Sequence, residues 1–213
     1  MKKLHKIVLL LSLLLSFPAF AGMSPELLDL SENWAKIKYQ MPKEKRVEAL
    51  QALNTKADAL VKAHPGEAGP LVWQAIILST TAGEKGGLGA LSLVKQAKKL
   101  LERAEAIDSN ALDGSIYTSL GSLYYQVPGW PIGFGDDDKA KRYLQKALAV
   151  NPNGMDPNYF YGDFLMQEKE YASAVQAFEH ALAAPPRQDR PIADAGRRSE
   201  IVAALAKAKQ ELH

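Results

Sequence analysis

The feature that most constrains the fold is a helix-forming pattern that occurs twice with identical internal spacing. The stretch KAKRYLQKALAVNP (139–152) aligns without a gap on SAVQAFEHALAAPP (173–186), and each places two alanines seven residues apart around a large apolar residue. In a helix, positions with this spacing lie on one face. Small residues on that face let a neighbouring helix approach closely, and the large residue fills the space between the axes. The spacing therefore predicts helices that pack as repeated units.

Each copy also begins with an apolar helix that carries a central glycine. SIYTSLGSLYY (115–125) and NYFYGDFLMQ (158–167) align on Gly121 and Gly162. Glycine inside a helix costs about 1 kcal/mol relative to alanine, so both positions indicate a close contact between helices. The residues predicted to pack the two copies together are Gly121, Tyr124, Ala140, Leu144, Ala147, Gly162, Leu165, Ala174, Phe178 and Ala181.

The rest of the chain adds helices on both sides of these copies. A looser copy covers about 70–109, and residues 22–69 hold two further helices, expected at 25–40 and 42–63, with a linker at 64–70. Residues 187–213 are predicted to form a capping helix, which a solenoid needs to cover its last repeat. The apolar face of this helix consists of Ile201, Leu205, Ala208 and Leu212. We therefore expect an all-α fold: a short helical solenoid of antiparallel helix pairs, with three repeats at about 70–109, 115–152 and 157–186.

Residues 1–21 have the composition of a signal peptide. Three lysines precede an eleven-residue apolar run, and the small residues Ala19 and Ala21 follow it. The apolar run is shorter than the roughly 20 residues that span a bilayer, although an uncleaved anchor is the alternative. We expect cleavage before Gly22 and a periplasmic or secreted protein.

Charge and cysteine content exclude several classes of partner and site. Without the three leader lysines, 23 of the 26 basic residues remain against 24 acidic ones, a net charge of −1. A chain so close to neutral has no electrostatic attraction to nucleic acid or to anionic lipid, and we expect neither partner. The absence of cysteine excludes disulfides, thiol nucleophiles, thiolate zinc sites and a lipid-modified cysteine. We expect no cofactor and no metal.

A loop of unusual composition, QVPGWPIGFGDDD (126–138), separates the two helices of the copy at 115–152. Its prolines restrict the backbone and its glycines permit tight turns. We expect Trp130, Ile132 and Phe134 to pack this loop onto the body of the protein, which would stabilise it by roughly 1.5–3 kcal/mol for each side chain. The sequence thus predicts an ordered loop.

The three aspartates that end this loop, residues 136–138, come directly before the apolar face of the next helix. One of them is expected to cap the free N–H groups of that helix, and all three suit its positive end. Calcium binding is the alternative, because adjacent carboxylates suit hard cations, but the spaced pattern of a calcium loop is missing.

The repeated pattern resembles the tetratricopeptide repeat (TPR), a helix–turn–helix unit of about 34 residues. The copy at 157–186 matches it best, although Asn158 stands where the family usually has tryptophan. Its matching residues are Gly162, Leu165, Ala174, Phe178, Ala181 and Pro186.

With its glycine–aspartate loop, the exported chain also resembles the periplasmic TPR proteins related to the T component of tripartite ATP-independent periplasmic (TRAP) transporters. This second resemblance implies association with an extracytoplasmic solute-binding protein. Many T components are lipoproteins, and this chain lacks the cysteine for that modification.

Our leading hypothesis is a non-enzymatic periplasmic module that binds another periplasmic or envelope protein. The first helices of stacked pairs line a curved surface, and its tyrosine, hydroxyl and carboxylate groups suit an extended protein segment. The predicted partner-binding residues are Thr118, Ser122, Tyr125, Trp130, Phe134, Tyr159, Asp163 and Met166.

Two alternatives remain open. One is a transport accessory or small-molecule carrier with a cavity beneath the 126–138 loop. The other is an enzyme whose acid–base pair would come from residues 136–138, Asp163 and Asp194.

Overall fold

The computed structural model describes residues 23–212, and within this range all regular secondary structure is helical. The predicted signal peptide and its cleavage site lie outside the described residues. The helices of the described range are α1 (Pro25–Gln40), α2 (Lys43–Ala63), α3 (Ala68–Lys85), α4 (Gly87–Ile107), α5 (Ser115–Gln126), α6 (Asp137–Val150), α7 (Met155–Gln167), α8 (Tyr171–Ala183) and α9 (Pro191–Gln210). The predicted all-α fold is confirmed.

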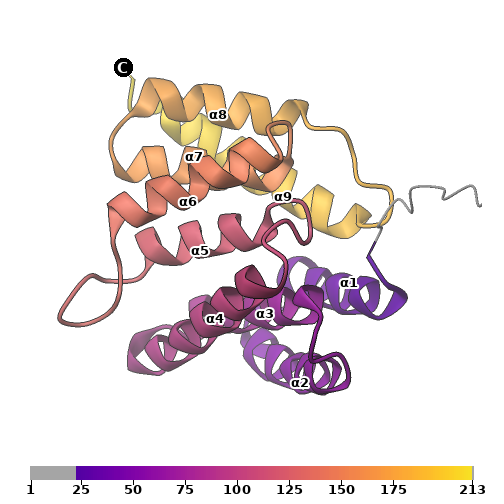
Figure 1. The fold of residues 1–213 in the computed structure, drawn as a ribbon. Coiled ribbons are helices and arrows are strands. Elements are labelled where there is room, and N and C mark those ends of the chain that lie inside the picture. Colours follow the sequence, from indigo (N-terminus) through magenta and orange to yellow (C-terminus); the bar gives the residue numbers. More distant parts are fainter. Residues whose placement is uncertain (1–22, 213) are drawn as a thin grey trace, which may run out of the picture.

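The helices form a stack of antiparallel pairs, α1–α2, α3–α4, α5–α6 and α7–α8 (Figure 1). The last helix, α9, packs on α8, and its first turns lie beside α1 at the other end of the chain. The stack is therefore a short solenoid whose first and last helices touch.

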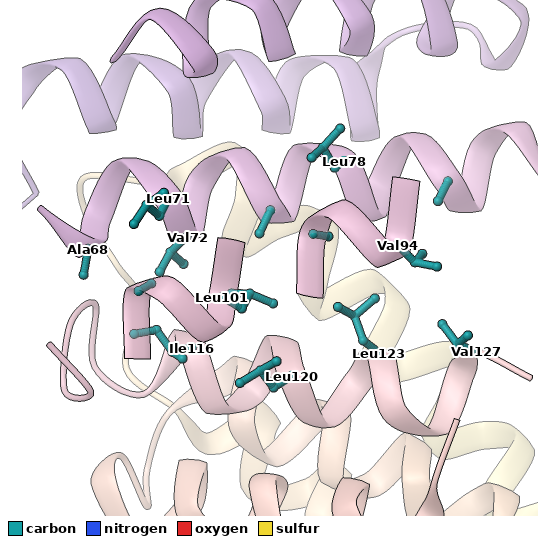
Figure 2. Packing of buried hydrophobic residues seen from close by; sticks show 14 residues of the cluster. Ala68, Leu71, Val72, Leu78, Val94, Leu101, Ile116, Leu120, Leu123 and Val127 are labelled. Atoms are coloured by element: carbon teal, nitrogen blue, oxygen red, sulfur yellow. The ribbon is translucent and has the colours of Figure 1, made fainter. Parts of the chain in front are cut away.

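The core continues from one pair into the next. Its largest cluster joins α3, α4 and α5, and Figure 2 shows Val72, Leu101 and Ile116 in the space between these helices. Leu101 of α4 and Leu120 of α5 have no exposed surface. Helix α5 also contributes Tyr124 and Tyr125 to a second cluster, with α6 and α7, so this helix links the apolar clusters of adjacent repeats.

Glycines inside α5 and α7 allow the close packing within each repeat. A Cβ atom on Gly121 would lie 2.7 Å from Cγ of Leu144, and one on Gly162 would lie 2.7 Å from Cε1 of Phe178. Leu144 and Phe178 have no exposed surface. All ten residues predicted to pack the two copies are buried.

A pair of glycine substitutions tests this packing. Gly121→Ala should lower the free energy of unfolding by about 1 kcal/mol, because overpacking against Leu144 outweighs the better helix propensity of alanine. Gly83→Ala in α3, where no atom lies within 4 Å of the added Cβ, should instead raise that free energy by up to about 1 kcal/mol. Urea unfolding followed by far-ultraviolet circular dichroism measures both. Two changes of the same sign would contradict the packing role of Gly121.

The helix limits differ from the prediction at the start of α3 and at both ends of the capping helix α9, which begins at Pro191. Helix α3 begins at Ala68, inside the segment predicted to be a linker, because Ala68 and Pro70 are buried against the core. At the other end, Leu212 lies beyond α9 and is 47% exposed, whereas Ile201 and Ala208 have no exposed surface. Leu212 is therefore not part of the capping face.

Candidate protein-interaction surfaces

Two residues predicted to face a partner are buried inside the stack. Thr118 is 4% exposed and Tyr125 is 6% exposed, so their prediction as surface residues is wrong. The Thr118 hydroxyl donates to the carbonyl oxygen of Gly114 at 3.1 Å. For Tyr125 the physical reason is that α7 packs against α5 and covers a face that the pattern of a single helix pair leaves open.

Tyr125 uses its polar end to join two repeats. Its hydroxyl donates to the Asp163 carboxylate at 2.7 Å. Burial raises the pKa of Tyr125 well above its ordinary value, and the nearby negative charge of Asp163 raises it further. The phenol therefore stays protonated and acts as a donor between α5 and α7.

Tyr159, a third predicted contact residue, is half-buried beneath an arginine. The guanidinium carbon of Arg197 lies 4.4 Å from the centroid of the Tyr159 ring and 4.8 Å from that of Phe160. Burial raises the pKa of Tyr159 to about 12, although the Arg197 charge acts in the opposite direction. Most of this ring therefore serves the contact between α7 and α9.

Arg197 belongs to a cluster of ion pairs that lies among α7, α9 and the segment before α9. Asp156 accepts from Arg197 Nε at 2.8 Å and from Arg187 at 2.6 Å. Asp194, which is 5% exposed, accepts from the Arg187 side chain at 2.6 Å, and Glu200 accepts from Arg197 at 2.6 Å. We call this set (Asp156, Arg187, Asp194, Arg197 and Glu200) the arginine cluster.

The arginine cluster extends to the first helix of the chain. Glu200 accepts a hydrogen bond from the Tyr39 hydroxyl at 3.2 Å and lies 3.6 Å from the Lys38 ammonium. A Cβ atom on Gly196 would lie 2.3 Å from Cγ of Tyr39, so glycine lets α9 approach the ring. These contacts hold α1 against α9.

The loop between α5 and α6 is held at its neck by backbone hydrogen bonds. Gly135 N–H donates to the carbonyl oxygen of Pro128 at 3.0 Å, and Asp136 N–H donates to the backbone carbonyl oxygen of Tyr124 at 2.9 Å. A Cβ atom on Gly135 would lie 1.9 Å from the Val127 carbonyl oxygen, so only glycine permits this approach. Phe134 packs edge-on against Tyr124, with ring centroids 5.8 Å apart.

Beyond this neck, the tip of the loop stands in solvent. Trp130 is 90% exposed and Ile132 is 63% exposed, and Figure 1 shows the loop projecting beyond the start of α6. The prediction that Trp130 and Ile132 pack onto the body is therefore wrong. The reason is that a backbone hydrogen bond between Gly135 and Pro128 closes the loop. Phe134, next to this bond, still reaches the body of the protein, whereas Trp130 and Ile132 lie further out.

The aspartates after the loop cap α6. Asp136 is the N-cap, and its carboxylate accepts from Lys139 N–H at 2.9 Å. That hydrogen bond and the Lys139 side chain hold the pKa of Asp136 below its ordinary value. Nowhere in residues 23–212 do three His, Cys, Asp or Glu side chains come together as a metal site. The calcium alternative has no support in this range.

Three carboxylates of the enzymatic alternative are bound to structural partners in separate parts of the fold. Asp136 caps α6, Asp163 accepts from Tyr125, and Asp194 accepts from Arg187. Each has a structural partner of its own. These three carboxylates therefore have structural roles, whereas Asp137 and Asp138 are exposed.

A shallow hollow lies between α7 and the end of α9. It has a volume of about 380 Å³. Two predicted partner-binding residues, Asp163 and Met166, contribute to its lining, which also includes Gln167, Tyr171, Lys207 and Glu211. A second hollow, of about 390 Å³, lies between α1 and α2. Neither hollow is lined by a residue of the 126–138 loop, so neither supports a cavity beneath it.

The remaining predicted contact residues lie in different settings. Ser122 is partly buried, and its hydroxyl donates to the Ser119 carbonyl oxygen at 3.0 Å. Trp130 is open to a partner, whereas Phe134 is turned towards Tyr124. The structure therefore separates the predicted set into the hollow beside α7, the loop tip and an interior group.

Comparison with known proteins assigns one of these helix pairs to a family. Residues 156–188 match the family described as tetratricopeptide repeat. This segment contains α7 and α8, which form an antiparallel pair around Gly162 and Phe178. The α7–α8 pair is thus a tetratricopeptide repeat. No curated protein matches the sequence.

Solved structures with similar helix arrangements have low sequence identity. A crystal structure of MamA is 22% identical, with coverage of 79% of this chain and 92% of that one and a TM-score of 0.46. A thermophilic TPR protein of Thermus thermophilus, TTC0263, is 16% identical, with coverage of 83% and 99% and a TM-score of 0.43. The helix pairing described above, and not these similarities, defines the fold.

No helix within residues 23–212 has both the length and the apolar character needed to cross a membrane.

Proposed function

We propose that the protein is a non-enzymatic interaction module that binds an extended segment of a partner protein in the hollow between α7 and α9. The observation that carries this proposal is the lining of that hollow, which lies on the first helix of the tetratricopeptide repeat. Asp163 and Met166, both predicted from the sequence as contact residues, form part of it.

The chemistry of the hollow suits a polypeptide. Glu211 offers a carboxylate and Lys207 an ammonium group, and Met166 and Tyr171 offer apolar surface. Asp163 adds a negative charge, although its carboxylate also accepts from Tyr125. A partner segment with one basic side chain, one acidic side chain and an apolar residue between them would meet an acidic, a basic and an apolar group in the hollow. Methionine adapts its shape to different partners, and the open form of the hollow suits a chain that crosses it.

Binding assays on hollow variants test the proposal. Purified residues 22–213 serve as bait for periplasmic proteins, and the dissociation constant of each identified partner is then measured by calorimetry. Met166→Ala and Lys207→Glu should each raise that constant about tenfold or more, because contacts at the centre of an interface carry most of its energy. Lys45→Glu, an exposed lysine on α2, is the matched control and should leave the constant unchanged. A partner that binds all four proteins equally would show that the hollow is not its site.

Export to the periplasm and a TRAP-type accessory role are more specific forms of this proposal. The signal-peptide composition of residues 1–21 supports the first, and the sequence of the 126–138 loop supports the second. An extracytoplasmic solute-binding protein is the partner that the accessory role requires. Its absence among the proteins captured by residues 22–213 would exclude that role and leave the module open to other envelope proteins.

A further inference from the structure

We propose that two copies of the chain form a two-fold symmetric dimer through the loop tip (residues 128–133) and the outer face of α6. The tip is apolar and exposed: Trp130 is 90% and Ile132 63% exposed, and backbone bonds at the neck hold the loop in place. Large apolar groups displayed in this way mark interaction sites. The charges beside the tip indicate what covers it.

The outer face of α6 carries a strip of charge that changes sign within one helical turn. Asp137 and Asp138 occupy its first turn, and Lys141 and Arg142 lie four residues further on, beneath them on the same face. All four residues are exposed. In the part of the chain that the structure describes, the ion pair at this end of α6 joins Lys139 to Asp136. The four residues of the strip form no ion pair there. The four charges of the strip can therefore pair along the helix or across an interface.

A strip of this kind is complementary to itself when reversed. A two-fold axis places the same patch of both copies face to face, so that patch must match its own rotated image. If two α6 helices lie antiparallel, with the axis between the acidic and the basic turn, Asp137 and Asp138 of each copy face Lys141 and Arg142 of the other. Both acidic pairs are then matched at once.

The same arrangement gives the loop tip a surface to cover. The loop projects beyond the start of α6 (Figure 1), so in an antiparallel pair it lies beside the later turns of α6 in the second copy. The exposed residues there include Gln145 and Ala149, which share one face with Asp138 and Arg142. They bring no further net charge. Trp130 and Ile132 would pack on this neutral part, with Arg142 of the second copy within reach of the indole face.

The oligomeric state of purified residues 22–213 tests the dimer directly. Sedimentation velocity and light scattering over a range of concentrations should give twice the chain mass. Trp130→Ala with Ile132→Ser should raise the dimer dissociation constant at least tenfold. Val202→Ser, which removes an exposed apolar side chain on α9, is the matched control and should leave it unchanged.

Charge-reversal variants distinguish the antiparallel pairing of two α6 helices from any other interaction of the loop tip. Asp137→Lys with Asp138→Lys makes the strip wholly positive, and Lys141→Glu with Arg142→Glu makes it wholly negative. Each variant alone should be monomeric, and an equimolar mixture should recover the dimer. Circular dichroism checks that each variant is folded. A wild-type chain that stays monomeric, even if its tip binds vesicles or another protein, would overturn the proposal, as would a dimer that survives both reversals.

Discussion

Phe178→Ala is expected to lower the free energy of unfolding by about 3–5 kcal/mol, the usual cost of removing a buried aromatic ring. Phe178 has no exposed surface, and it fills the space that Gly162 leaves between α7 and α8. Its ring also lies 6.1 Å from that of Tyr159, measured between centroids. Alanine would leave a cavity inside the tetratricopeptide repeat, where Gly162 has no side chain to fill it. Urea unfolding at equilibrium measures the loss.

The control for Phe178 is Gln176→Ala on the same helix. Gln176 is exposed, so this change should shift the free energy of unfolding by no more than about 0.5 kcal/mol. A loss below about 1 kcal/mol for Phe178→Ala would mean that α7 and α8 do not depend on this ring for their packing.

Asp156→Asn is expected to lower the free energy of unfolding by about 2 kcal/mol, because it removes the shared partner of two arginines from a cluster that is only partly buried. The Arg197 side chain is 12% exposed and the Arg187 side chain 24%. Asparagine keeps the shape of the aspartate but not its charge. Urea unfolding measures this loss, and Glu179→Gln, which breaks an exposed pair with Lys209, should cost less than about 1 kcal/mol.

The contribution of Asp156 also depends on pH. Burial alone would raise its pKa, but the charges of Arg197 and Arg187 outweigh burial and hold that pKa well below its ordinary value. The pKa of an aspartate in the unfolded chain is about 4. At pH values above this, a carboxylate whose pKa is lowered in the fold contributes its full stabilisation, and this contribution is lost as the pH falls towards the pKa in the folded state. The difference between wild type and Asp156→Asn should therefore be constant from pH 6 to 8 and shrink below about pH 4. A difference that stays constant down to about pH 2 would contradict the ionic origin of the effect.

The helices could be predicted from the sequence because their signals are local. Ala140, Leu144 and Ala147 mark the packing face of α6 by spacing alone, and Gly121 marks the helix contact that they face. The N-cap at Asp136 was also predictable, because a capping residue acts within three positions of itself. The fold class therefore required no information from distant parts of the chain.

The errors arose where distant residues decide the environment. Tyr125 was predicted to be exposed because its own helix pair leaves it open, and it is buried by α7 of the next pair. Trp130 was predicted to be packed because its side chain is large and apolar, and backbone bonds at the loop neck keep it outside.

The arginine cluster could not be predicted from local sequence patterns. Arg197 and Tyr39 are separated by most of the chain, and each bonds to Glu200. No periodicity in the sequence links them.

The contact between α1 and α9 also has a consequence for the evolution of the chain. Most repeat proteins gain or lose units easily, because each unit touches only its neighbours. Here the ring of Tyr39 lies directly over Gly196, so insertion or deletion of one helix pair would move α9 away from α1. The ring would lose its contact with Gly196, and the Glu200 carboxylate would lose Tyr39 and Lys38. The number of repeats is therefore fixed by the closure of the chain on itself, and related proteins of the same design should vary in their loops and not in their helix count.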